Sequence, residues 1–149
     1  MTEIVLPSHG NPLGTIFGGH IMSWMDIAAA ISAGRHARKV VVTASFDAVH
    51  FVAPVKVGQV VHIKAMVNFA SRTSMEVGLR VDAEDLATGK FTHTASAYTT
   101  FVALAKNGKP SRVPLVLPET PDEKRRYVQA QKRREVRLQL AKKLKNPSH

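Results

Sequence analysis

Three residues in the first apolar stretch of this chain have side-chain types that hydrolytic chemistry uses. Gly18 and Gly19 precede a long apolar run, and Asp26 is the only ionisable side chain between Ile21 and Ala33. A helix that begins at two glycines exposes backbone N–H groups where the helix dipole favours negative charge. An ionised carboxylate in apolar surroundings costs several kcal/mol unless it has a partner, a raised pKa or a function. Amides that can hold an oxyanion and a carboxylate that can handle water predict a hydrolytic site.

The spacing of these groups limits how such a site can be built. Seven positions separate Gly19 from Asp26, which is roughly 10 Å along a helix axis at ~1.5 Å per residue. A reacting carbonyl must lie about 3 Å from its oxyanion donor and similarly close to the base or its water. One helix therefore does not offer both groups to one carbonyl. We infer a site made by two chains, so that a homodimer is part of the mechanism.

The composition indicates one globular domain. The 149 residues include 44% hydrophobic residues and no cysteine, which excludes disulfides, thiol nucleophiles and thiolate metal sites. The histidines have no HxxxH spacing, so we expect no metal site. No run approaches the ~18 apolar residues of a membrane helix, and the N-terminus lacks the features of a signal peptide. We expect a cytoplasmic protein.

The net charge of +10 is concentrated at the C-terminus. Residues 119–149 contain 10 basic and 4 acidic side chains, against 11 and 7 in residues 1–118. A basic helix is most often a solvated surface, and this one has a single aromatic residue for stacking on bases. Nucleic-acid binding through residues 119–145 is therefore the more distant alternative. The mild excess on the rest of the chain suits a phosphorylated small-molecule ligand.

The elements that position the candidate groups follow from hydrophobic periodicity. Apolar residues surround the axis of a helix predicted over 17–34, which indicates burial. Alternating residues predict antiparallel strands joined by short turns, curled around that helix. The expected strands cover residues 4–6, 40–53, 61–69, 75–81 and 91–105.

A second helix follows a connector rich in proline. Thr120 is its expected N-cap, with Glu123 completing a capping box. Val136, Leu140 and Leu144 form a weak apolar seam, which favours a surface helix that docks on a neighbour or frays in solvent. We therefore divide the chain into a domain over 1–106, a connector over 107–118 and a basic helical tail over 119–149.

Several motifs resemble one known family. They are Leu6-Pro7-x-x-x-Asn11-x-x-Gly14-Thr15-x-Phe17-Gly18-Gly19-x-x-x-x-Trp24-Met25-Asp26, Val42-Thr43-Ala44-Ser45-x-Asp47-x-Val49-x-Phe51 and Arg72-Thr73-Ser74-Met75-Glu76-Val77. This pattern resembles the acyl-CoA thioesterases of the hotdog fold, in the branch of bacterial acyl-CoA hydrolases and animal cytosolic acyl-CoA thioester hydrolases. The resemblance runs from residue 4 to residue 137.

The resemblance implies an α+β fold and an enzyme. A long central helix is wrapped by a five- or six-stranded antiparallel sheet, with a basic C-terminal helix added, and protomers form dimers or trimers of dimers. Such an enzyme hydrolyses acyl-CoA to a free acid and CoA without a cofactor, since CoA is part of the substrate and product.

The resemblance also assigns residues to roles. Asn11 and Asp26 correspond to the family's catalytic pair, contributed by opposite hotdog units. The acyl carbonyl would lie at the helix start of Gly18, polarised by the amide of Gly19 or His20. Three residues correspond to the segment near the pantetheine arm and the phosphates, namely Arg72, Thr73 and Ser74.

The same residues can also be interpreted as having structural roles without catalysis. Asp26 could be a carboxylate paired at a dimer seam, and Asn11 a turn residue. Asp47 and His50, on opposite faces of one strand, are a residual acid–base pair for which we favour structural roles. In another functional class, a hotdog protein could bind acyl-CoA or a nucleotide as a sensor without turnover. A hotdog dehydratase is disfavoured, because no histidine with an acidic partner occupies the expected position near the helix start.

Overall fold

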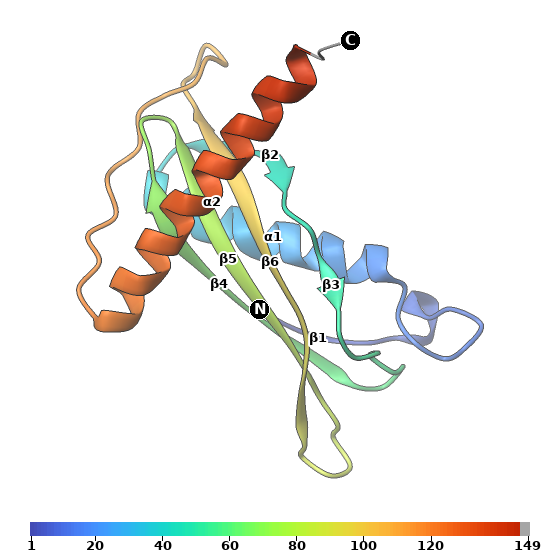
Figure 1. Cartoon of the computed structure of the whole chain (residues 1–149). Coiled ribbons are helices and arrows are strands. Elements are labelled where there is room, and N and C mark those ends of the chain that lie inside the picture. Colours follow the sequence, from blue (N-terminus) through green and yellow to red (C-terminus); the bar gives the residue numbers. More distant parts are fainter. Residues whose placement is uncertain (147–149) are drawn as a thin grey trace.

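The computed structural model describes residues 1–146 and places a six-stranded antiparallel sheet between two helices (Figure 1). The strand order is β1-β4-β5-β6-β2, and β3 pairs with β6 beside β2. The helix α1 lies on the inner face of the sheet and α2 crosses the outer face. The elements are β1 (Thr2–Ile4), a 3-10 turn (Pro7–His9), α1 (Gly18–Ala37), β2 (Val40–Phe46), β3 (His50–Phe51), β4 (Val60–Ala70), β5 (Ser74–Glu84), β6 (Phe91–Leu104) and α2 (Pro121–Lys145).

The central helix α1 is the element predicted over 17–34, and it continues to Ala37. Phe17 is its N-cap, and Arg38 closes the C-terminus in the left-handed conformation, with its amide bonded to the Gly34 carbonyl. Its buried residues are mainly small, and a small side chain lets the sheet approach the helix closely. These are Ile21, Met25, Ala28, Ala29, Ala33 and Ala37.

One apolar side of α1 is open in the single chain, which corrects the expectation of burial all round. Ile27 and Ile31 are 49% and 46% exposed. The neighbouring strand β2 ends the sheet, and its Val40 is 69% exposed. An edge strand presents unpaired backbone groups, and an open apolar face costs free energy in water. The side of the protomer that carries α1 and β2 is therefore suited to contact a second molecule.

The segment predicted as one strand over 40–53 is two strands. β2 ends at Phe46 after a register shift between Thr43 and Ser45, and pairing resumes at β3. Asp47 lies between them, and its amide donates to the Tyr98 carbonyl at 2.9 Å. Asp47 and His50 therefore do not lie on one continuous strand, as the sequence suggested. The expected strand over 4–6 lies slightly earlier, at β1.

The helix α2 begins as its capping signals predict. The Thr120 hydroxyl accepts a hydrogen bond from the Glu123 amide at 3.1 Å. The Glu123 carboxylate accepts from the Glu119 amide at 2.9 Å, one residue earlier than a standard capping box. Both bonds satisfy backbone donors that a helix start leaves free.

The face of α2 that docks on the sheet differs from the seam predicted from sequence. Val136, Leu140 and Leu144 are exposed in the protomer. A stripe at helical spacing faces the sheet instead, made of Glu123, Arg126, Tyr127, Ala130, Arg133 and Arg137. The helix thus packs on its own sheet rather than fraying. Residues 147–149 of the expected basic tail lie outside the described residues.

A buried carboxylate fixes α2 to the sheet. Glu76 of β5 is 2% exposed and receives Arg133 through two nitrogens, at 2.7 and 3.1 Å. Arg137 donates to Glu76 at 3.0 Å and to Asp47 at 2.9 Å. Burial opposes the charge of Arg133, but hydrogen bonding and the charge of Glu76 outweigh it and raise the pKa of Arg133. Asp47 therefore has a structural partner on α2.

Neither helix of the described chain combines the length and the hydropathy that a membrane crossing requires.

Candidate active site

The start of α1 presents free backbone donors. The His20 amide donates to the Phe17 carbonyl at 3.0 Å. Within residues 1–146, the Gly18 and Gly19 amides have no backbone acceptor. The two glycine amides therefore point their hydrogens out of the first turn, where the dipole favours an anion. Of the two amides predicted to polarise a carbonyl, that of Gly19 is available and that of His20 is occupied.

Gly18 and Gly19 have different structural roles. A Cβ at Gly18 would lie 3.3 Å from the Phe51 ring, so Gly18 allows the helix start to pack on β3. A Cβ at Gly19 would meet no atom within 4 Å. Gly19 is the residue that leaves space for another molecule beside the open amide.

Asp26 is half-buried in the middle of α1 and is oriented by one neighbour from β2. The Thr43 hydroxyl donates to Asp26 Oδ1 at 2.7 Å. The bond leaves Oδ2 without a hydrogen-bond donor among the described residues. A carboxylate with one oxygen fixed and the other available can act on water or on an electrophile. Thr43 lies in the second motif but is not among the site residues predicted from the sequence.

Asn11 is a turn residue in the protomer. Its Oδ1 accepts from the amides of Leu13 and Thr15, at 2.9 and 3.2 Å, and its Nδ2 donates to the Thr15 hydroxyl at 2.8 Å. The structural reading of Asn11 is therefore correct for this loop. The amide group has two N–H donors, so one remains for another group. The hydrogen bonds within the loop hold the Asn11 side chain in place and leave one of its N–H donors for another partner.

An aromatic cluster supports the loop beside the helix start. The His9 ring packs against the rings of His20 and Trp24, with 5.1 Å between the ring centroids in each pair. The Phe17 ring is tilted against that of His20, with 6.3 Å between their centroids. His9 also accepts a hydrogen bond from the Leu6 amide through Nδ1. The predicted site residue His20 therefore has a packing role, while its amide is bonded to the Phe17 carbonyl.

In the predicted segment, Arg72 and Thr73 lie in the turn between β4 and β5, and Ser74 begins β5. The Arg72 carbonyl accepts from the Val113 amide at 3.0 Å, which ties this turn to the connector. Ser74 pairs with Val102, and Val102 pairs with Val42 of β2. Two strand spacings, about 10 Å, separate the turn from the strand that carries Thr43.

The protomer thus assembles two half-sites. Gly18, Gly19 and His20 form the start of α1, and Asn11 lies in the loop that leads into it. Asp26 joins Thr43 further along the helix, on the side of the Arg72–Ser74 turn. Because α1 is one continuous helix, Gly19 and Asp26 remain roughly 10 Å apart along its axis. The continuous helix is the one that the prediction of a site shared by two chains assumes.

Among residues 1–146, no three His, Cys, Asp or Glu side chains form a group that could hold a metal ion.

The sequence of this chain is similar to those of known thioesterases. The thioesterase superfamily model matches residues 13–90. An acyl-CoA thioester hydrolase of Bacillus subtilis is 44% identical over 122 residues, 82% of this chain and 71% of its own length. Acyl-coenzyme A thioesterase 11 of Mus musculus is 42% identical over 98% of this chain. This chain spans only about a quarter (24%) of that relative.

Two solved structures are similar to the whole protomer. An apo-hexameric acyl-CoA thioesterase superposes with a TM-score of 0.91, 44% identity and coverage of 95% of this chain and 90% of its own. An acyl-CoA hydrolase of Staphylococcus aureus, solved with butyryl-CoA, CoA and CoA disulfide, has a TM-score of 0.90 and 41% identity, covering 97% and 88%. Single Asn→Ala, Asp→Ala and Thr→Ala variants of that hydrolase have also been solved.

Proposed function

The chain belongs to the thioesterase superfamily, and we propose that it hydrolyses acyl-CoA to a free carboxylic acid and CoA. The observation that carries the proposal is the pair of half-sites on α1: an open Gly19 amide and a carboxylate fixed by Thr43. The relatives named as acyl-CoA thioesterases and the neighbour solved with butyryl-CoA support this substrate class.

The thioester carbonyl lies against the start of α1 in this mechanism. The Gly19 amide donates to the carbonyl oxygen and holds the negative charge that develops as the carbonyl is attacked. The helix dipole adds to this stabilisation, since its positive end faces the oxyanion. The remaining N–H of Asn11 orients the water or the carbonyl.

Asp26 supplies the second half of the reaction. Its oxygen Oδ1 is held by Thr43, and Oδ2 either takes a proton from water as a general base or attacks the carbonyl as a nucleophile. Solvent ¹⁸O found in the Asp26 carboxylate after single-turnover hydrolysis identifies the nucleophilic path, in which Asp26 forms an anhydride with the acyl group and water then attacks the Asp26 carbonyl. The departing thiolate resembles that of cysteine, with a pKa of about 8.5, so no strong acid is required.

Two protomers together complete the site in this proposal. The amide and the carboxylate lie on one rigid helix too far apart to meet, and the open sides of α1 and β2 offer a surface for a second copy. A two-fold dimer then brings Gly19 of each chain toward Asp26 of its partner, making two equivalent sites. The hexameric neighbour supports a trimer of such dimers.

The substituted positions in the Staphylococcus aureus hydrolase support the same residues. Its Asn→Ala, Asp→Ala and Thr→Ala substitutions occur at the same separations along the chain as Asn11, Asp26 and Thr43 have here. The proposal therefore includes Thr43 as the residue that orients the catalytic carboxylate. It also places the activity in cytoplasmic fatty-acid metabolism, with Arg72, Thr73 and Ser74 near the CoA moiety.

A complementation experiment tests the shared site. Asp26→Asn and Asn11→Ala are purified separately, each with little acyl-CoA hydrolysis, then mixed and allowed to exchange subunits. A mixed dimer contains one intact site and one doubly altered site, so random exchange restores about a quarter of wild-type activity.

The controls separate the alternatives. A site contained in one chain gives no recovery, because every site in a mixed dimer then carries one substitution. Wild-type protein that binds butyryl-CoA without releasing CoA identifies a sensor instead of an enzyme. Asn11→Asp mixed with Asp26→Asn serves as a second pair if loss of the Asn11 turn bonds unfolds the loop.

A further inference from the structure

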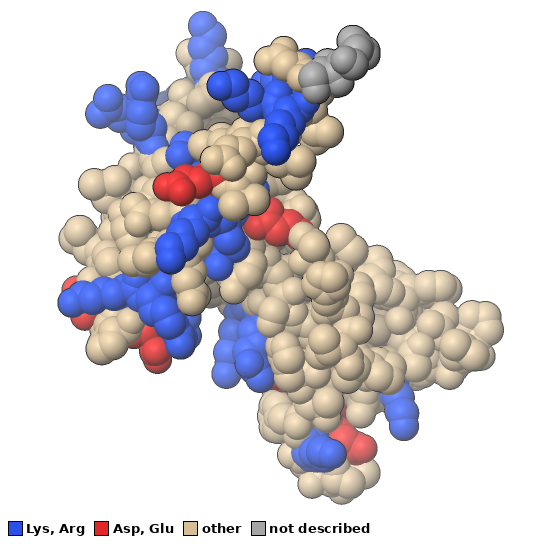
Figure 2. All heavy atoms as spheres, in the orientation of Figure 1, with Lys and Arg blue, Asp and Glu red and all other residues tan. Residues whose placement is uncertain are grey.

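The outer face of the sheet contains a hollow on the side opposite the proposed active site. Its volume is about 370 Å³. Cationic and hydroxyl side chains line it on three strands and on α2, namely Lys64, Arg80, Ser96, Tyr98 and Arg126. Figure 2 shows Lys and Arg atoms extending from α2 onto the neighbouring sheet surface. This hollow plays no part in thioester hydrolysis as proposed.

The sheet register places two cations directly opposite each other. Lys64 of β4 pairs with Arg80 of β5, and Arg80 pairs with Ser96 of β6. Like charges at directly opposed positions destabilise a sheet. An anion bound between Lys64 and Arg80 removes that repulsion.

The floor of the hollow is made by a residue without a side chain. Gly78 lies between Met66 and Tyr98 in the next row of the sheet. A Cβ at Gly78 would come within 2.5 Å of Asn68 Nδ2, so the Asn68 side chain lies over Gly78 and would have to shift to admit a larger residue. Gly78 and Asn68 both line the hollow, together with Met66 and Tyr98.

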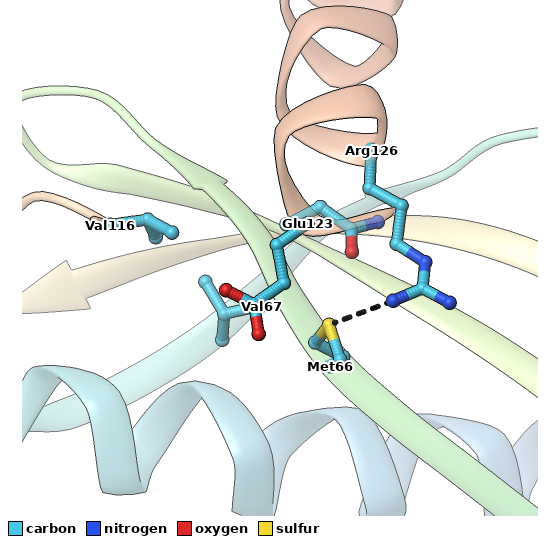
Figure 3. A pocket seen from close by; sticks show the side chains of 6 residues that line it. Met66, Val67, Val116, Glu123 and Arg126 are labelled. Atoms are coloured by element: carbon cyan, nitrogen blue, oxygen red, sulfur yellow. Dashed lines mark hydrogen bonds between the residues drawn. The ribbon is translucent and has the colours of Figure 1, made fainter. Parts of the chain in front are cut away.

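The third cation comes from the helix. Arg126 is half-buried and reaches from α2 toward Met66 of β4, with Nη1 3.7 Å from the sulfur (Figure 3). A thioether is a weak acceptor, so most of the five guanidinium donors remain available. Within residues 1–146, no carboxylate forms an ion pair with Arg126 or Lys64. The nearby Glu123 carboxylate is bound to the Glu119 amide.

The charge of the hollow is positive after its two acidic neighbours, Asp82 and Glu123, are counted. Arg80 donates through Nε to both oxygens of Asp82, at 3.1 and 3.2 Å. Burial opposes the ionised form of Asp82, but Arg80 and His93 outweigh it and lower the pKa of this carboxyl. Asp82 and Glu123 together therefore offset two of the three cations, which leaves the hollow with a net positive charge. An anion such as a phosphate monoester complements this charge.

We propose that this hollow binds a phosphate group of a small molecule. Lys64 and Arg80 hold the phosphate from the sheet and Arg126 holds it from α2, using the charge-assisted hydrogen bonds that these side chains form with phosphate oxygens. The Ser96 and Tyr98 hydroxyls add donors. Met66 gives the organic part of the ligand an apolar wall.

Binding has a mechanical consequence for α2. A ligand held by both Arg126 and the sheet joins the helix to β4 and β5, in addition to the bonds of Glu76. A ligand that binds only this folded arrangement stabilises it in proportion to the logarithm of its concentration. Saturable stabilisation by phosphate therefore reports the site without any measurement of hydrolysis.

The test uses the full chain and inorganic phosphate at ionic strength held constant with potassium chloride. Calorimetry and thermal unfolding should show saturable binding by wild type. Affinity should fall at least tenfold in Arg126→Gln and in Lys64→Gln. Arg125→Gln is the matched control, because Arg125 is the adjacent arginine, is exposed and pairs with Asp122 on the helix surface. It should bind as wild type does.

Two further arms identify the source of the phosphate and protect the result. Saturable binding of glycerol 3-phosphate indicates a free phosphate ester as the ligand. If CoA instead binds with a second equivalent per protomer, and Arg126→Gln loses that equivalent, CoA itself is the ligand. Ser96→Asp adds a carboxylate without removing any packing and should abolish phosphate binding. Asp26→Asn should retain it, so failure of hydrolysis leaves this proposal standing. A non-saturable effect, or equal binding by Arg125→Gln and Arg126→Gln, overturns it.

Discussion

Two carboxylates on opposite faces of the same sheet have contrasting surroundings. Asp26 faces β2, and one hydroxyl, that of Thr43, binds it. Glu76 on the outer face is bound by Arg133, Arg137 and Asn68. A buried carboxylate that two arginines neutralise is held for structure, whereas one held by a single neutral hydroxyl keeps an oxygen for chemistry. The number of cations around each group separates a structural acid from a candidate catalytic one.

The two helices, α1 and α2, are held against the sheet in different ways. The inner helix α1 is held by small apolar residues against the sheet. The outer helix α2 has one fully buried residue, Ala130, and is held by ion pairs and by Arg133 stacked 3.6 Å over the Tyr98 ring. Long arginine side chains cover apolar surface with their stems while their charged ends reach Glu76. Burial in α2 is therefore achieved by residues that a hydrophobicity pattern counts as polar.

Asp26→Asn should produce the largest effect of any single substitution. The loss of a general base lowers the rate by on the order of 10²–10⁴, which is measured as CoA release with a thiol reagent. Thermal stability should be unchanged, because Asp26 forms no ion pair among the described residues. Near wild-type hydrolysis by this variant would remove Asp26 from the mechanism.

Glu76→Gln should have the opposite phenotype. Neutralising one partner of a buried ion pair costs about 3–5 kcal/mol of stability, and here it leaves Arg133 and Arg137 close together without their shared anion. The measurement is the free energy of unfolding from urea titration, with hydrolysis assayed well below the midpoint.

Glu84→Gln is the matched control for the loss of Glu76. Glu84 pairs with His62 at the surface end of the sheet, and both side chains are partly exposed. Exposed pairs contribute about 0–1 kcal/mol. If Glu76→Gln lost activity but no stability, the assignment of the two carboxylates to different roles would be wrong.

The inner face could be predicted from sequence and the outer face could not, for a physical reason. Gly18, Gly19 and Asp26 stand out because they interrupt an apolar run, and the strands follow from alternation. Arg133 and Arg137 are two of many basic residues in a polar helix, and nothing in their spacing reveals that Glu76, far away in sequence, faces them. The apolar seam of Val136 stands out in the pattern, but another face of α2 packs on the sheet of the same chain.

Thr43 was missed for a related reason. The motif that contains Thr43 indicates the family, but the contact of Thr43 with Asp26 joins a helix to an edge strand. The register of that strand against α1 depends on tertiary packing and on the shift between Thr43 and Ser45. Local pattern predicted both elements without predicting their alignment.

Thr43→Val should weaken catalysis less than loss of Asp26 does. A hydrogen bond to a charged group is worth about 1.5–3 kcal/mol, which corresponds to a rate loss of roughly 10- to 150-fold if the bond is needed in the transition state. The ratio kcat/KM for butyryl-CoA measures it. Thr43→Ser keeps the hydroxyl and should retain most activity, so equal losses in the two variants would show that the methyl group matters instead.

Apart from the control Glu84→Gln, Thr120→Ala should have the smallest effect, and it tests whether α2 unfolds together with the sheet. The substitution removes the acceptor for the Glu123 amide, which costs about 0.5–2 kcal/mol of helix stability. If Arg133 and Glu76 join α2 to the sheet, this loss appears in the free energy of global unfolding, followed by Trp24 fluorescence in α1. Thr120→Asp preserves the cap and should restore the wild-type value. A far-UV circular dichroism transition that precedes the fluorescence change would instead show that α2 separates first, and the ion pairs on the outer face would then contribute little to cooperativity.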